Sequence, residues 1–213
     1  MNLPLNTAST HPTQRWQRTA LTLVVVTMIY NTLEAGLGLW SGIEAKSVAL
    51  VGFGLDSIIE CVAAGALLWR LRVEGRGTSH HELERAELRV HRIVGVTFLL
   101  LAIYVTGQAG WVLATRAAPE ESPAGIVLAA VSLVVMPLVA WGKLRAAREI
   151  GSNALRAEAK ETLACSYLSF TLLLGLVANA MGAWWWADPL AALLMVPWLV
   201  KEGREGVRGS CCD

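Results

Sequence analysis

Residues 47–71, SVALVGFGLDSIIECVAAGALLWRL, decide the fold class of this chain. The stretch is long and apolar enough to cross a bilayer as one helix, which takes about 20 residues. It nevertheless carries Asp56 and Glu60, although a charge at the centre of a membrane helix costs about 2.5–3.5 kcal/mol. Their spacing places both carboxylates on one face, one turn apart, where they repel unless a proton or cation lies between them. The pattern predicts a functional acidic pair; the alternative is a structural pair that is bonded to neighbouring helices.

Composition places the whole chain in the membrane class. It has 213 residues, of which 54% are hydrophobic, and a mean hydropathy of +0.49. We expect an all-α membrane protein in which residues 16–201 form a six-transmembrane-helix bundle. Residues 1–15 are a disordered cytoplasmic tail without a signal-peptide pattern, and residues 202–213 are a short cytoplasmic tail. The expected helices cover about 16–40, 47–71, 90–115, 124–141, 154–183 and 188–201, and HHELERAELR before the third is also expected to be helical.

The basic residues predict the orientation of these helices. Every Lys and Arg except Lys46 and Arg116 lies in the termini, in the charged segment 72–89 and the residues flanking it, or in the basic loop expected after residue 141 and the start of the next helix. With six helices, all these segments share one side of the membrane. Basic loops stay in the cytoplasm, so both termini are predicted to be cytoplasmic.

A second pair of ligand-type residues lies in another apolar segment. Glu161 and Cys165 are also four residues apart, and they can complete a tetrahedral site with Asp56 and Glu60. Three carboxylates and one thiolate suit a divalent ion of intermediate softness, with zinc the default and cobalt, cadmium, iron or manganese as alternatives. Taken alone, Glu161 is equally compatible with a solvated helix end, and Cys165 with a small core residue.

Other polar residues have weaker signals. Asn31 and Glu34 lie one turn apart in the first helix and are candidates for a supporting shell or a proton relay, or for plain helix packing. His80 and His81 are candidates for collecting metal at the cytoplasmic mouth, or belong to a solvated helix. Cys211 and Cys212 are expected to belong to a frayed, reduced tail, with metal binding or attachment of a lipid as the alternatives. No nucleotide-binding glycine loop is present.

These motifs resemble those of the cation diffusion facilitator (cation efflux) family. The family's Ser-x-Ala-Leu segment is similar to residues 47–50, which lead to Asp56 and Glu60. Its fifth helix resembles residues 154–159, ALRAEA, followed here by Glu161 and Cys165 where the family has His-x-x-x-Asp. A Gly-Leu run, a Trp and Asp-Pro then follow in both. The resemblance implies a six-helix fold, these four residues as metal ligands, and the exchange of divalent metal cations for protons.

The resemblance also sets expectations about assembly and location. The motifs that carry it belong to the transmembrane domain, and we expect a diverged branch of the family that lacks the cytoplasmic C-terminal domain. We therefore expect a homodimer held by membrane helices, with the lipid bilayer, metal ions and protons as partners and no nucleic acid. An integral multi-pass protein of the bacterial inner membrane is expected.

The function expected from sequence is that of a secondary transporter that exports divalent cations, most simply Zn²⁺, from the cytoplasm. The alternative is a non-transporting membrane regulator or subunit with a decayed site, since His-to-Glu and Asp-to-Cys changes are what decay leaves. A membrane enzyme ranks last, because no nucleophile-and-base set is visible. Which metal moves, the proton stoichiometry and the oligomeric state stay open.

Overall fold

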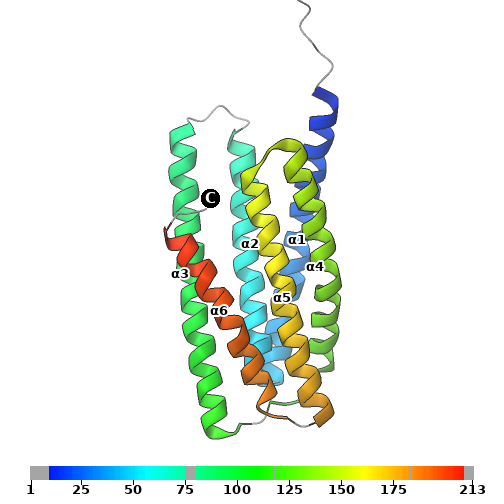
Figure 1. The fold of residues 1–213 in the computed structure, drawn as a ribbon, viewed down its shortest axis with the longest axis vertical. Helices are drawn as coiled ribbons and strands as arrows, with labels where there is room; N and C mark the ends of the chain where they lie inside the picture. Colours follow the sequence, from blue (N-terminus) through cyan, green and yellow to red (C-terminus); the bar gives the residue numbers. More distant parts are fainter. Residues whose placement is uncertain (1–9, 75–79, 118, 183, 209–213) are drawn as a thin grey trace, which may run out of the picture.

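The computed structural model describes residues 10–74, 80–117, 119–182 and 184–208 (Figure 1). Within this part of the chain the six regular elements are all helices, and the predicted six-helix fold is confirmed. The helices are α1 (Thr10–Glu44), α2 (Val48–Glu74), α3 (His80–Thr115), α4 (Pro123–Ile150), α5 (Asn153–Gly182) and α6 (Ala187–Arg208).

Most of the helices are longer than their apolar cores. The start of α3 at His80 confirms that HHELERAELR, residues 80–89, is helical. The predicted basic loop after residue 141 is wrong, because α4 continues to Ile150. Its residues 143–150 are mostly good helix formers and contain neither Gly nor Pro. The helix ends at Gly151, which adopts φ 68° and donates its backbone N–H to Ala147 O.

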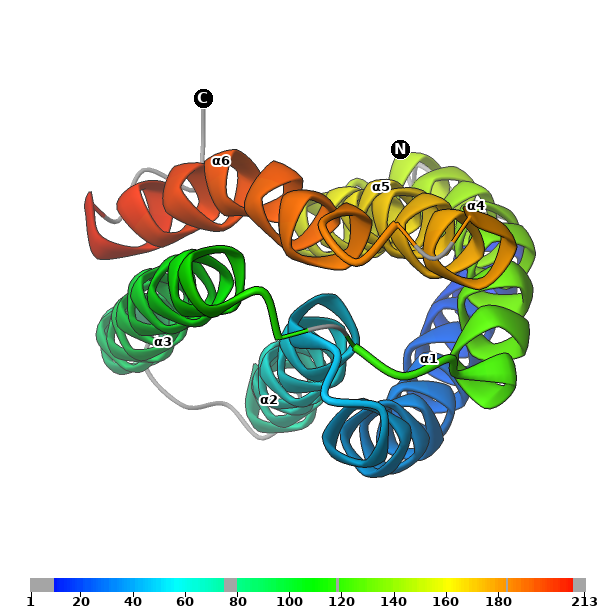
Figure 2. The ribbon, with the colours of Figure 1, turned by 90° about the horizontal axis from the view of Figure 1, so that it is seen from below.

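The helices run alternately up and down, so that α2 and α5 are antiparallel (Figure 1). Seen along the bundle in Figure 2, α3, α2 and α1 form one row, and α6, α5 and α4 form the other. Packing of α1 on α4 and of α3 on α6 joins the rows. Helix α2 contacts α1, α3, α5 and α6, so it is enclosed by neighbouring helices on several sides.

The outer surface of the bundle fits a lipid environment. Five helices, α1 to α5, contain segments long and apolar enough to cross a membrane. In α6 the apolar part, residues 187–200, is shorter, and this helix packs extensively along α3. Large apolar side chains lie exposed on the outside, among them Leu33, Ile103 and Leu138, each more than 60% exposed. Contiguous apolar surface of this kind is rare in water-soluble monomers, and the chain is an integral multi-pass membrane protein.

Two contacts fix how α2 is seated. Asp188, the second residue of α6, is buried and accepts hydrogen bonds from the Ser47 hydroxyl and, over 2.9 Å, from the Val48 backbone N–H. This carboxylate therefore caps the start of α2 and ties it to α6. Farther along, α2 approaches α1 closely at Gly54, where a Cβ atom would lie 2.8 Å from the backbone nitrogen of Leu39.

Candidate metal centre

The centre of the bundle brings together three of the predicted ligands. Asp56 and Glu60 of α2 and Cys165 of α5 each offer a ligand atom, and these atoms lie within 4.8 Å of one another. All three side chains are buried, with at most 9% of their surface exposed. We refer to them as the central triad. Two carboxylates and a thiol held this closely make a site with both hard and soft ligands for a divalent cation.

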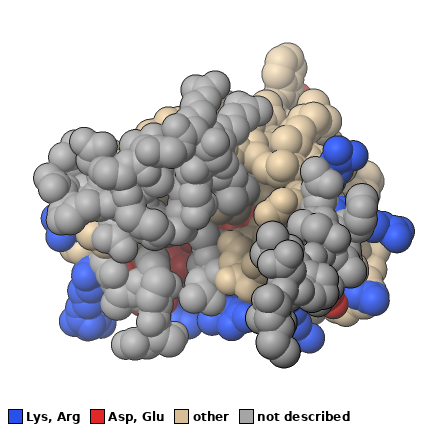
Figure 3. Space-filling view, turned by 90° about the horizontal axis from the view of Figure 1, so that it is seen from above, with Lys and Arg blue, Asp and Glu red and all other residues tan. Residues whose placement is uncertain are grey.

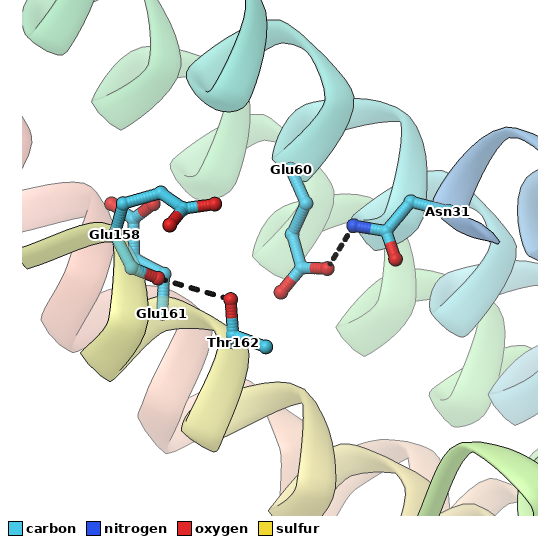
Figure 4. Close-up of a pocket in the computed structure, with 5 residues that line it drawn as sticks. All are labelled: Asn31, Glu60, Glu158, Glu161 and Thr162. Carbon is cyan, nitrogen blue, oxygen red and sulfur yellow. Dashed lines mark hydrogen bonds between the residues drawn. The ribbon is translucent and has the colours of Figure 1, made fainter. Parts of the chain in front are cut away.

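Glu161, the fourth predicted ligand, does not join the central triad. It is half-buried and lines a pocket beside the triad together with Asn31, Glu60, Glu158 and Thr162. Figure 4 shows Glu158 and Glu161 on α5 facing Glu60 and Asn31 across this pocket.

Glu161 and Cys165 lie on the same face of α5, one helical turn apart. This face is broadly buried, through residues 158, 162, 165, 168, 169, 172 and 176. Cys165 is buried among them at the level of the triad, whereas Glu161, one turn earlier, is half-buried and lines the pocket. The pocket therefore continues the triad through Glu60, which belongs to both.

Asn31 contacts the triad directly. Its Nδ2 donates a hydrogen bond to Glu60 Oε2 over 2.7 Å, and both side chains are buried (Figure 4). Glu34, one turn later in α1 and also buried, accepts a hydrogen bond of 2.9 Å from the Ser57 hydroxyl. Asn31 is thus placed to orient a candidate ligand, as hydrogen-bonded partners of metal ligands commonly do. Glu34 reaches the site through Ser57, the residue that follows Asp56.

The structure reveals a buried ion pair that the sequence analysis missed. Lys143 of α4 is fully buried and donates hydrogen bonds to Glu158 Oε1 over 2.6 Å and to Thr162 Oγ1 over 2.9 Å. Both partners line the pocket. A signal was present in the sequence, because Lys143 shares helical spacing with Met136, Ala140 and Ala147, all of them buried.

Of the remaining candidates, His80 and His81 belong to the end of the bundle at which α3 begins. His80 and His81 open α3, but their side chains lie outside the described residues, as do Cys211 and Cys212. Figure 3 shows this end of the bundle. Lys and Arg side chains lie around the periphery, and acidic atoms are visible closer to the middle of the view.

Comparison with known proteins agrees with this architecture. The family model of the cation efflux transmembrane domain matches residues 24–210. The uncharacterized transporter sll1263 of Synechocystis sp. is 26% identical over 161 residues, covering 74% of this chain and 52% of that protein. Transmembrane protein 163 of Xenopus laevis is 24% identical over 164 residues, covering 77% and 57%. The chain spans little more than half the length of these curated relatives. Since the family match covers most of its residues, the chain belongs to the cation efflux family of membrane cation transporters.

Proposed function

We propose that this chain is a secondary transporter that exports a divalent metal cation, zinc first among the candidates, from the cytoplasm in exchange for protons. The observation that carries the proposal is the central triad, buried between two antiparallel helices of a cation efflux domain. Two acids and a thiol have little reason to converge inside a membrane unless they bind something, because intramembrane acids are costly and usually functional.

The proposed cation is the cargo of this site. Asp56, Glu60 and Cys165 bind it, and Glu161 is proposed as the fourth ligand, reaching the ion from the pocket that it shares with Glu60. The mixed set of oxygen and sulfur donors favours zinc, cobalt or cadmium over magnesium and calcium, which bind oxygen alone. Asn31 orients Glu60 through the hydrogen bond of 2.7 Å.

Proton exchange follows from the chemistry of these ligands. Carboxyl and thiol groups bind metal in their deprotonated forms, so loading the site releases protons and emptying it takes them up. If the site opens to the cytoplasm and then to the other side, each cycle moves a cation outward and protons inward. Formation of a homodimer through membrane helices and location in a bacterial inner membrane stay predictions.

The test is transport by the purified chain in proteoliposomes that enclose a pH-sensitive dye. An imposed Zn²⁺ or Co²⁺ gradient should drive a proton flux, which Asp56→Ala and Glu60→Ala abolish. Cys165→Ser should keep the flux and shift the preference from Zn²⁺ and Co²⁺ toward harder Mn²⁺. Cys61→Ser is the matched control, since Cys61 follows Glu60 in α2 but lies outside the triad. Unchanged flux in Asp56→Ala or Glu60→Ala would refute the assignment.

If the chain is instead a non-transporting regulator, its former ligand residues are expected to lie elsewhere. A decayed site is expected to let its former ligands turn toward lipid, where drift replaces them by apolar residues. Glu60 and Cys165 are instead buried within the bundle. No flux with any ion, in protein that is folded, would nevertheless favour the regulator.

A further inference from the structure

Lys143 and Glu158 form an ion pair that is buried inside the bundle. A contribution to stability does not by itself explain a pair in such a place. No part of the Lys143 side chain is exposed, and about a tenth of the Glu158 side chain is. The Lys143 ammonium lies among oxygen atoms, 2.6 Å from Glu158 Oε1 and 2.9 Å from Thr162 Oγ1. Withdrawing two charges from water often costs more than their attraction returns, and apolar replacements of such pairs are frequently neutral or stabilising.

The pocket beside this pair has unused acceptors. Among the described residues, Glu158 Oε2 and Asn31 Oδ1 are buried without a hydrogen-bond partner, although both residues line the pocket. Their surroundings include the carboxylates of Glu60 and Glu161 (Figure 4). These acceptor oxygens can be satisfied only by a donor or a cation. The pocket is thus an oxygen-lined place for positive charge, and Lys143 brings a positive charge to it.

We propose that the ammonium of Lys143 is a resident cation: it takes the position in which Glu158 and Thr162 would otherwise hold a second metal ion. It thereby limits the chain to one exchangeable divalent ion, the one at the central triad. The inference rests on the proposed function in one respect, since it treats the triad as the first cation position. The excluded ion would be bound by oxygen alone, from Glu158, Thr162 and the unpaired Asn31 Oδ1 of the same pocket, while Glu161 belongs to the ion at the triad.

A purely structural role for the pair is the competing explanation. The pair does connect α4 to α5, but Ala146 and Ala147 of α4 and Leu155 of α5 already pack in one apolar cluster. A purely structural role for the pair also gives no reason for Glu158 Oε2 to be buried without a hydrogen-bond partner. The two explanations differ in what happens when the ammonium is removed. If the pair only connects α4 to α5, removing the ammonium should at most lower the stability of the protein. If the ammonium is a resident cation, its removal should open a new ion site.

The experiment counts Co²⁺ bound by the purified chain in detergent, by equilibrium dialysis, and records the absorption spectrum of the complex. Cobalt bound to a thiolate gives a sulfur-to-cobalt charge-transfer band, which an oxygen-only site lacks. The original chain should bind one Co²⁺ with this band. Lys143→Met should bind two, and the second ion should leave the band unchanged. The double variant Lys143→Met/Glu158→Gln should return to one.

A matched control comes from the opposite end of the bundle. Lys46 also pairs with a glutamate, Glu120, over 2.8 Å, but both side chains are exposed. Lys46→Met should therefore bind one Co²⁺, like the original chain. Circular dichroism and gel filtration establish that each variant is folded. If Lys143→Met does not fold, Lys143→Gln, which retains a hydrogen-bond donor for its partners, takes its place under the same criteria.

The inference is overturned if folded Lys143→Met binds one Co²⁺, or if the original chain already binds two. A second ion that persists in the double variant also overturns it, because the ion is then not held by Glu158. A chain that binds no Co²⁺ with a charge-transfer band refutes the proposed function instead. In that case a gain of one Glu158-dependent ion in Lys143→Met still supports the resident cation, and no gain overturns it.

Discussion

Replacing Asn31 by leucine should weaken metal binding without destroying the site. The substitution keeps the side-chain size but removes the donor that reaches Glu60 Oε2 over 2.7 Å. Hydrogen bonds to charged groups contribute about 1.5–3 kcal/mol, and about 1.4 kcal/mol corresponds to a factor of ten. Because Asn31 contacts a ligand and not the ion, we expect affinity for Co²⁺ or Zn²⁺ to fall about 10- to 100-fold, as for other partners of metal ligands.

The assay is a competition titration of the purified chain with a chromophoric chelator, paired with transport in proteoliposomes. Thr32→Val is the control: the neighbouring Thr32 is exposed and bonds Met28 O and Cys61 Sγ, away from the triad. In a Glu60→Gln background, Asn31→Leu should have little further effect, because the two residues act through one bond. Equal affinities of Asn31→Leu and the original chain, or additive losses in the double variant, would refute the reasoning.

Two further predictions concern the stability of the scaffold, measured by thermal and chemical unfolding in detergent with tryptophan fluorescence. Asp188→Ala should lower the free energy of unfolding by about 2–4 kcal/mol, since it strands two buried donors at the start of α2; Ser122→Ala, which removes one ordinary helix cap, should cost about 1 kcal/mol. Gly54→Ala should destabilise by about 1–3 kcal/mol, because its Cβ would meet Leu39 at 2.8 Å, whereas Gly36→Ala, with open space around it, should be tolerated. Equal stabilities within either pair would contradict these contacts.

The sequence was most informative where one physical requirement dominated. Apolar length predicted the helices, because backbone groups within a bilayer must be satisfied by helical hydrogen bonds. Asp56 and Glu60 stood out because carboxylates are costly at membrane depth, so their place in a buried cluster was predictable. The end of α4 also has a sequence signal, because the left-handed position at its C-cap is occupied by Gly151, which has no Cβ, although the predicted helix ended at residue 141.

Prediction failed where two requirements competed. Lys143 looked like a cytoplasmic loop residue, because basic residues after an apolar segment usually mark the end of a membrane helix. Its burial depends on Glu158, which belongs to another helix and forms the compensating charge. Which side chains pair between two helices depends on the crossing angle of the helices and on the rotation of each about its axis. The spacing of residues within one helix does not determine either. The same limit applies to Glu161 and Cys165: their spacing places both on one face of α5, but only the packing of α5 decides which of them lies close to Asp56 and Glu60.

The central triad and the pocket beside Lys143 differ in the atoms that they offer to a cation. We therefore expect Cys165 and Lys143 to control different properties of ion binding. The central triad combines oxygen with sulfur, whereas the charged and polar side chains that line the pocket beside Lys143 offer oxygen as the metal ligand. If Lys143 excludes a second ion, the thiolate-containing place is left as the position for a divalent cation, and its softness sets the preference. Cys165→Ser should then change which ion binds but not how many, and Lys143→Met should change how many. A Lys143 substitution that altered ion preference at unchanged stoichiometry would mean that its charge acts on the triad directly, and the separation would fail.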